Sequence, residues 1–192
     1  MKKLKVSIKG TRDLIMHNGR LANPLDPWTR AVKAVIEKKD KTDKGLIELM
    51  RVEARASIYE TEKKEVGLPA EIVYASILEA ARVRKLGMKI ERGVRYDPIT
   101  EPLFINGKIF NADKFIEDPK NIYYVSVGNR GNRVMRSRPI IKGEWRADYE
   151  FELDQNILNI ESFVEILVYA GPYIGLCDRR PLYGTYKGEV IK

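Results

Sequence analysis

Strict alternation of apolar and polar residues predicts two long strands, one near the N-terminus and one in the last third of the chain. Residues 3–9, KLKVSIK, place Leu4, Val6 and Ile8 on one face, which is typical of a half-buried strand. Residues 144–153, EWRADYEFEL, alternate in the same way. The residues that this second pattern predicts to be buried are Trp145, Ala147, Tyr149, Phe151 and Leu153.

Shorter patterns add further strands. Residues 53–61, EARASIYET, alternate and are interpreted as a strand, and residues 185–191, TYKGEVI, as a closing strand. Residues 103–110, LFINGKIF, contain Asn106-Gly107 between apolar residues, which is the strongest short-range signal for a two-residue hairpin. The second half of the chain is therefore expected to be rich in strands and turns.

Apolar residues at helical spacing predict four helices. Asp26 is the expected N-cap of the first, and Pro27 its first helical residue. The second helix carries Leu46, Ile47, Leu49 and Met50. Pro69 begins the third, and the fourth, residues 160–170, is expected to end at the Gly-Pro pair of 171–172.

The order strand, helices, strand, helix, strands, helix, strand indicates an α+β fold. Its commonest form is a ferredoxin-like or RRM-like antiparallel sheet with helices on one face. Residues 122–127, IYYVSV, and 133–141, RVMRSRPII, flank the segment 128–132 and predict a β-hairpin finger. We therefore expect one α+β domain over residues 1–192, with a β-hairpin insertion around 100–143.

Positive charge is concentrated in that insertion. The chain has a formal net charge of +8, and residues 119–143 carry six cations and no acidic residue. These cations are Lys120, Arg130, Arg133, Arg136, Arg138 and Lys142. Tyr123 and Tyr124 lie just before the arginines, and cations interleaved with aromatic rings are typical of nucleic-acid binding. The alternative is a solvated loop that arginine keeps soluble.

A second basic and aromatic segment lies near the C-terminus. It contains Arg179, Arg180, Tyr183, Tyr186 and Lys187 along a chain broken by glycines. Such a segment can follow a phosphate backbone while its rings stack on bases. Tyr183 and Tyr186 could equally be core residues of the last strand. In a ferredoxin-like fold the finger and this segment can edge the same sheet, which predicts one continuous groove.

Several function classes have no support in the sequence. The chain lacks the motifs GxxxxGK[ST], HExxH and CxxC, so no P-loop, no common zinc site and no cofactor is expected. Its single cysteine, Cys177, cannot form an internal disulfide. The alternating carboxylates of residues 148–152 are interpreted as a solvated strand face, not as a metal site. With no apolar run of about 18 residues and no signal-peptide pattern, we expect a cytoplasmic protein without a membrane partner.

His17, the single histidine, is a weak catalytic candidate. A histidine can take the proton from a ribose 2′-hydroxyl, and this chemistry would make the protein a metal-independent endoribonuclease. The simpler interpretation is a turn histidine bonded to backbone. The preferred expectation is that no residue is catalytic.

Two resemblances extend this picture. Residues 67–82, GLPAEIVYASILEAAR, and 171–190, GPYIGLCDRRPLYGTYKGEV, resemble the proline-started helix and the glycine-containing C-terminal loop of repeat-associated (RAMP) Cas7-like CRISPR proteins. That family implies guide-RNA coating by several subunits, each with a hairpin thumb. The pattern MHNGRLANP, RVMRSRP and GLCDRRPLYGTY also resembles an uncharacterised family of phage and prophage proteins. The Gly-Ser pair that usually follows the proline in Cas7-like proteins is absent here.

The function expected from the sequence is non-enzymatic binding of single-stranded DNA or RNA in a basic and aromatic groove. Several copies would associate along one strand, because one such domain covers only a few nucleotides. Phage replication or recombination and a CRISPR-type complex are the settings that the resemblances suggest. Two alternatives remain: the endoribonuclease using His17, and a phage protein-interaction module or inhibitor of host defence.

Overall fold

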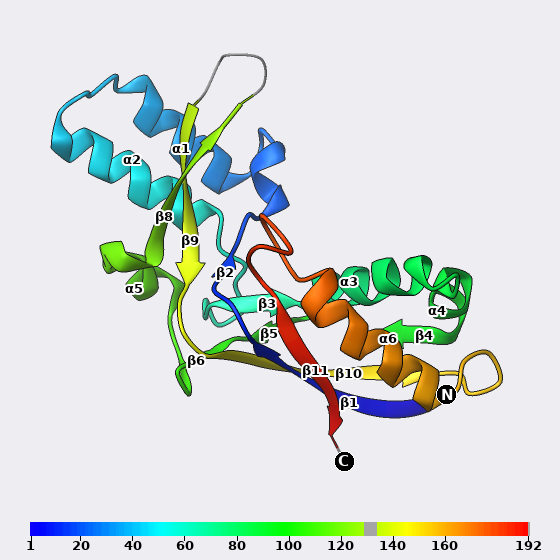
Figure 1. The fold of residues 1–192 in the computed structure, drawn as a ribbon. Coiled ribbons are helices and arrows are strands. Elements are labelled where there is room, and N and C mark those ends of the chain that lie inside the picture. The colour runs from blue at the N-terminus through cyan, green and yellow to red at the C-terminus, as the bar shows by residue number, and fades with distance from the viewer. Residues whose placement is uncertain (129–133, 192) are drawn as a thin grey trace.

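A computed structural model describes residues 1–128 and 134–191, and its elements form two parts (Figure 1). The larger part is an antiparallel sheet with the strand order β11 (Tyr186–Ile191), β1 (Lys2–Gly10), β10 (Trp145–Leu153), β6 (Phe104–Ile105) and β7 (Lys108–Ile109). A further strand, β4 (Val94–Tyr96), also pairs with β10. The N- and C-termini lie at this sheet.

The two long central strands follow from their alternating sequences. Leu4, Val6 and Ile8 of β1 are buried, and all five residues predicted to be buried in β10 are buried too. The register pairs Val6 with Tyr149, so the apolar residues of both strands share one face. The predicted strands 3–9 and 144–153 are confirmed.

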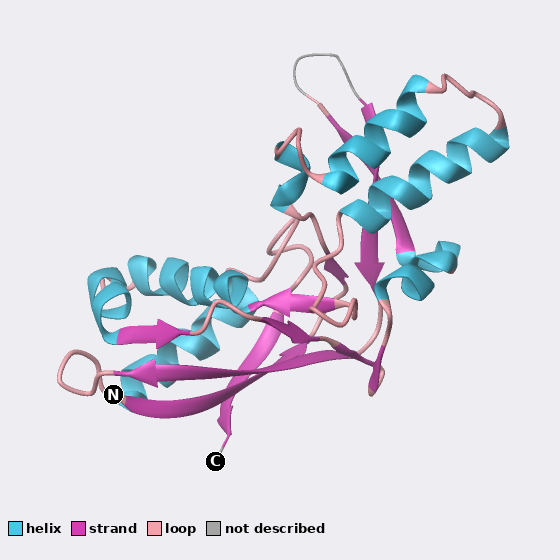
Figure 2. Cartoon of the chain, turned by 180° about the vertical axis from the view of Figure 1, so that it is seen from behind, coloured by secondary structure: helices cyan, strands magenta, loops and turns pink. Residues whose placement is uncertain are grey.

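Helices cover the apolar face of the sheet, as Figure 2 shows from behind. They are α3 (Ala70–Val83), α4 (Gly87–Gly93) and α6 (Ile160–Tyr173). Gly171 lets α6 approach β11 closely, since a Cβ at this position would lie 2.0 Å from the backbone oxygen of Tyr186. The helix runs to Tyr173, slightly past its predicted end, with Pro172 in its last turn.

The α+β class is confirmed. Along the chain, β1, α3, β4, β10, α6 and β11 form a β-α-β-β-α-β succession, and their sheet order is β11-β1-β10-β4. The ferredoxin-like expectation depends on this succession, which long segments interrupt between β1 and α3 and between β4 and β10.

The smaller part contains the finger, the hairpin of β8 (Ile122–Val127) and β9 (Val134–Ile141). β9 also pairs with β2 (Leu14–Ile15), which completes a separate three-stranded sheet. Beside the finger lie α1 (Pro27–Glu37), α2 (Asp43–Ala56) and α5 (Ala112–Glu117) (Figure 1). The remaining short elements are η1 (Gly19–Ala22), which precedes α1, the paired strands β3 (Gly67–Pro69) and β5 (Thr100–Pro102), and η2 (Pro119–Asn121), which follows α5.

One strand prediction is wrong. Residues 53–56 complete α2, which Thr42 caps, and Ser57 ends this helix. Their alternation has another cause: Ala54 and Ala56 are buried in the core, while Glu53 and Arg55 are buried by ion pairs. Alanine favours the helix, and the charged residues find partners from distant segments.

One hydrophobic core joins the two parts. Phe151 and Phe163 of the sheet part and Ile58, Phe115 and Ile122 of the smaller part belong to the same cluster of buried residues. The predicted turn is present, with positive φ at Asn106 and Gly107. Among the helices that the structure describes, none has the length and apolar character needed to span a bilayer.

Candidate nucleic-acid interface

Three of the predicted site residues share one face of the finger. The register pairs Tyr123 with Arg138 and Val125 with Arg136. Because side chains alternate along a strand, Tyr123, Arg136 and Arg138 are on the same face, and Tyr124 is on the other. The hairpin thus brings together an aromatic ring and two guanidinium groups.

This face meets the C-terminal loop, residues 174–185, between α6 and β11. The rings of Tyr123 and Tyr183 lie 5.8 Å apart between centroids. Arg138 Nε lies 3.7 Å from Asp178 Oδ2. The backbone N–H of Asp178 donates to the Ile15 carbonyl at 2.9 Å, which fixes the loop beside β2. The two basic segments therefore lie side by side.

The route by which they meet differs from the prediction. The finger and β11 do not edge the same sheet, because the finger pairs with β2 in a separate sheet. The loop before β11 makes the contact instead. Strand alternation gives no information on which sheet a hairpin joins, so the sequence could not distinguish these routes.

Three of the arginines have acidic neighbours that lie far away in the sequence. Arg136 Nη1 bonds to Glu53 Oε1 of α2 at 2.8 Å, and Arg180 Nη2 to Glu79 Oε2 of α3 at 3.0 Å. Arg138 faces Asp178. The absence of acidic residues from 119–143 therefore did not indicate unpaired arginines, because folding supplies the partners.

Arg138 is nevertheless incompletely bonded. It is 7% exposed, and its Nε has no hydrogen-bond partner among the described residues. Its one hydrogen bond there is long, 3.5 Å from Nη1 to the Ser137 carbonyl. Burial lowers the pKa of this guanidinium, while Asp178 and Glu53 act in the opposite direction. An arginine remains charged under such conditions, so the site holds a buried cation whose Nε has no hydrogen-bond partner among the described residues.

His17 lies between two hollows at this junction. The α1 hollow, about 220 Å³, is lined by His17, Arg136, Arg138 and residues of α1. The loop hollow, about 290 Å³, is lined by His17, Tyr59, Asp178 and Arg180 among others. Partial burial, followed by the charge of Arg138, lowers the pKa of His17, and Asp178 partly opposes this shift. His17 is therefore neutral near pH 7 and can accept a proton.

Hydrogen bonds hold the chain at His17 and at the residue that follows it. Tyr59 Oη donates to the His17 carbonyl at 2.9 Å, and Asn18 Nδ2 to the Ile58 carbonyl at 3.0 Å. Burial raises the pKa of Tyr59 to about 12, so this hydroxyl keeps its proton and remains a donor. The His17 backbone is thus tied to the segment that follows α2.

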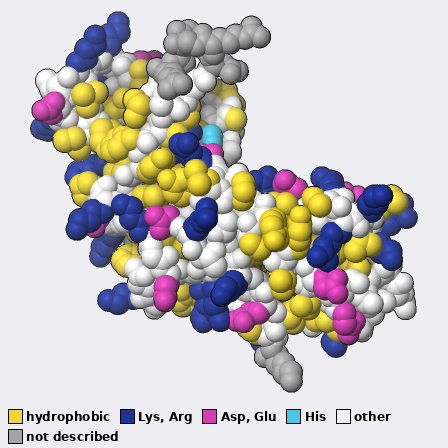
Figure 3. Space-filling model, in the orientation of Figure 1, with side chains coloured by type: hydrophobic (Ala, Val, Ile, Leu, Met, Phe, Trp, Pro, Cys, Tyr) yellow, Lys and Arg dark blue, Asp and Glu magenta, His cyan; other side chains and the backbone are white. Residues whose placement is uncertain are grey.

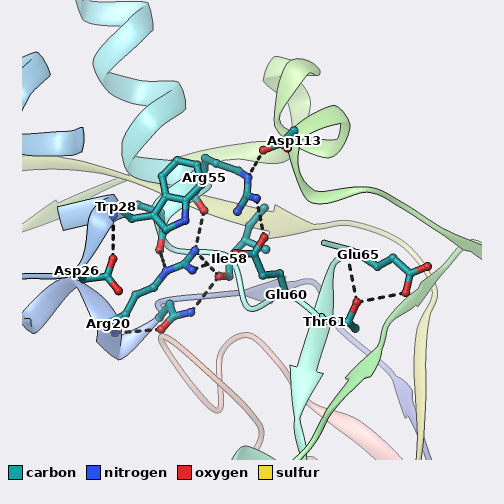
Figure 4. Close-up of polar contacts among 11 residues, drawn as sticks. Arg20, Asp26, Trp28, Arg55, Ile58, Glu60, Thr61, Glu65 and Asp113 are labelled. Atoms are coloured by element: carbon teal, nitrogen blue, oxygen red, sulfur yellow. Dashed lines mark hydrogen bonds and ion pairs between the residues drawn. The ribbon is translucent and has the colours of Figure 1, made fainter. Parts of the chain in front are cut away.

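A network that the sequence did not indicate fixes this segment further (Figure 4). Arg55, buried at the end of α2, pairs with Glu60 at 2.6 Å and with Asp113 of α5 at 2.5 Å. Its guanidinium lies 4.5 Å from the ring centroid of Trp28 in α1. Arg20 also lies over Trp28 and pairs with Glu60. The network connects α1, α2, α5 and η1 behind the site.

Two predicted tyrosine roles need revision. Tyr186 is 1% exposed, and its hydroxyl lies 3.2 Å from Ser76 Oγ in the core, so it cannot stack on a base. The core alternative for Tyr186 is therefore confirmed. Tyr124 is exposed, but it lies on the other face of the finger, with its hydroxyl 3.3 Å from Met50 Sδ of α2. Tyr123 and Tyr183 remain as candidate stacking residues.

The remaining basic candidates are scattered or lie outside the described residues. Arg179 is exposed on the C-terminal loop. The exposed lysines Lys120, Lys142 and Lys187 line neither hollow. Arg130 and Arg133 fall within residues 129–133, which the structure does not describe.

Thiol and metal chemistry find little support around this site. Burial raises the pKa of the Cys177 thiol to about 12, so it is not a thiolate at neutral pH. On the open face of the sheet, Glu150 pairs with Lys3 at 2.6 Å and Asp148 accepts from Ser7 at 2.6 Å. Within residues 1–128 and 134–191, no three His, Cys, Asp or Glu residues are grouped so as to hold a metal ion.

The functional interpretation of this chain depends on the geometry described above. The chain matches no protein-family model, and a search of curated proteins finds no match.

Proposed function

We propose that the protein binds single-stranded nucleic acid, without catalysis, on the surface where the finger meets the C-terminal loop. In this proposal Arg138, Arg136 and Arg180 contact phosphates, and Tyr123 and Tyr183 stack on bases. Phosphate contacts give affinity with little sequence preference. Flat aromatic contacts require unstacked bases, which favours single strands over duplexes.

The observation that carries the proposal is the meeting of two basic and aromatic segments from distant parts of the chain. Tyr123 and Tyr183, with ring centroids 5.8 Å apart, come from β8 and from the loop before β11. Arg138 lies beside them, and its Nε has no hydrogen-bond acceptor among the described residues. Aromatic rings next to such a cation match a nucleotide strand, which presents bases and phosphates in regular alternation.

The first test is a filter-binding assay with single-stranded DNA, single-stranded RNA and duplex at two salt concentrations. The proposal expects both single strands, or one of them, to bind more tightly than the duplex, with affinity that falls as salt rises. Binding that is absent at low salt would contradict the proposal. The protein-interaction or defence-inhibitor function would then become the leading candidate.

A matched pair of arginine variants tests the site. Arg180 and Arg84 have similar side-chain exposure, 39% and 37%, and each forms one ion pair with a glutamate. Only Arg180 lines the loop hollow; Arg84 belongs to the cap of α3. Arg180→Gln should weaken single-strand binding and make the salt dependence of log K shallower by ~0.7. Arg84→Gln should change neither, and equal effects of both variants would remove Arg180 from the site.

A second candidate function follows from the position of His17. A neutral histidine between two hollows and beside Arg138 can act as a general base, with the arginine stabilising developing negative charge. The metal-independent endoribonuclease therefore remains the alternative. Cleavage of single-stranded RNA in the presence of a chelator, abolished by His17→Ala, would establish it, and an intact substrate after long incubation would reject it.

The setting of the function is part of the proposal. Several copies would bind along one strand in the cytoplasm, as part of phage replication or recombination or of a CRISPR-type complex. The resemblance of residues 67–82 and 171–190 to RAMP Cas7-like proteins, and that of the wider pattern to phage and prophage proteins, supports this setting.

A further inference from the structure

The α1 hollow combines an apolar wall with a charged wall. Leu21, Val32 and Ile36 contribute the apolar lining, from η1 and α1. Arg136 and Arg138 of β9, together with His17 and Glu53, contribute the polar lining. A ligand with an apolar surface and an anionic group would match both walls.

The apolar wall is available because α1 buries none of its residues completely. Val32 and Ile36 lie one helical turn apart, on the side of α1 that lines the hollow, and Ile36 is 46% exposed. Figure 3 shows hydrophobic side chains gathered over the part of the molecule that contains α1, α2 and the finger. Contact with a ligand would remove this apolar surface from water.

The charged wall has one unsatisfied group. Both carboxylate oxygens of Glu53 are engaged, Oε1 by Arg136 at 2.8 Å and Oε2 by the Ser137 N–H at 3.0 Å. Arg138 Nε, in contrast, lacks a partner among the described residues. Arg138 lines the hollow, so a phosphate oxygen bound there would give its guanidinium a charged acceptor.

Resting on the proposed function, we infer that the α1 hollow binds a single nucleotide of the strand. Its base packs against Val32 and Ile36, and its phosphate lies at Arg138. The volume of about 220 Å³ is below the ~300–1,000 Å³ of pockets that enclose drug-sized ligands, so the hollow suits one small unit. The rest of the strand passes Tyr123 and Tyr183.

A pair of variants with equal exposure tests this site. Ile36 and Leu46 are both 46% exposed on the α1–α2 pair, but only Ile36 lines the hollow. Ile36→Glu places a carboxylate where the nucleotide binds, and we expect about tenfold weaker oligonucleotide binding, because like charges in contact repel strongly. Leu46→Glu adds the same charge outside the hollow and should leave affinity within about twofold of the parent.

Two further ligands separate the base contact from charge effects. A strand of the same length with abasic sites keeps the phosphates and lacks the bases, so the uncharged variant Ile36→Gln should weaken binding of the normal strand and not of the abasic strand. Ile36→Gln also serves as the test variant if Ile36→Glu fails to fold.

Titration with AMP measures whether a free nucleotide, which presents the same base and phosphate, enters the hollow.

The outcomes distinguish this inference from the function on which it depends. If the parent binds single strands and the Ile36 and Leu46 variants bind equally well, the nucleotide site is wrong and the proposed function stands. Equal losses on normal and abasic strands with Ile36→Gln would also overturn it. If the parent binds no strand, the proposed function fails; AMP binding that Ile36→Glu abolishes would then assign the hollow to a free nucleotide.

Discussion

Trp145 shows how one residue connects strand alternation to stability. Its indole is 2% exposed at the start of β10, and its Nε1 donates to the Arg12 carbonyl at 2.8 Å. Trp145→Ala should lower the free energy of unfolding by ~3–5 kcal/mol, because it leaves a cavity and an unpaired carbonyl. Chemical denaturation measures this change, and a loss below ~1 kcal/mol would contradict the core assignment.

We expect ligand binding in the two hollows beside His17 to depend on pH. Charged or titratable side chains line both hollows beside His17. They are Glu53, Tyr59, Arg136, Arg138, Cys177, Asp178 and Arg180. Burial and Arg138 hold the pKa of His17 below its ordinary value of 6.5. A phosphate bound beside the imidazole favours the protonated form, so single-strand affinity should rise as pH falls below 6.5.

Fluorescence titrations at several pH values check this prediction, with His17→Gln as the variant that should lose the pH dependence. In the absence of ligand, low pH has the opposite, unfavourable effect, which acts on the stability of the fold. Because the folded-state pKa is depressed, the unfolded chain takes up the proton first, and stability should decrease as pH falls below 6.5. A parent whose affinity is unchanged across this range would exclude His17 from contact with the strand.

At the scale of elements, the position of the His17 segment depends on the Arg55 network. Glu60 pairs with Arg55, whose side chain is 7% exposed, and with Arg20. Glu60→Gln would leave Arg55 buried with Asp113 as its remaining charged partner. We expect a loss of ~3 kcal/mol in the free energy of unfolding, at the low end for a broken buried pair.

The matched control for this network is Glu165→Gln, which removes the exposed ion pair with Arg84. It should cost less than ~1 kcal/mol, because exposed pairs contribute little. Denaturation curves of the two variants give both values. Equal losses would mean that the Arg55 network does not stabilise the junction of α1, α2 and α5.

At the scale of the whole molecule, the net charge of +8 favours association with a polyanion. If copies bind side by side, the number bound should rise in proportion to strand length. Sedimentation with single strands of about 10, 20 and 40 nucleotides measures this number, since comparable domains cover about 4–16 nucleotides. One copy on every strand would contradict binding along the strand and leave a single-site complex.

The sequence by itself determined the features that depend on neighbouring residues. Alternation located β1 and β10 and their buried faces, Asn106-Gly107 located a turn, and Asp26 located the start of α1. These signals are local, because side-chain period, capping and turn conformation act within a few residues. The α+β class followed from their order along the chain.

Only the tertiary structure decided which distant residues meet. It paired Arg136 with Glu53 and Arg180 with Glu79, buried Tyr186, and placed His17 between two hollows. It also turned residues 53–56 into the end of a helix, since burial and long-range ion pairs replaced the strand face that their alternation suggested. Composition within a window cannot specify such contacts, because electrostatic and packing partners are set by distance in space and not by distance along the chain.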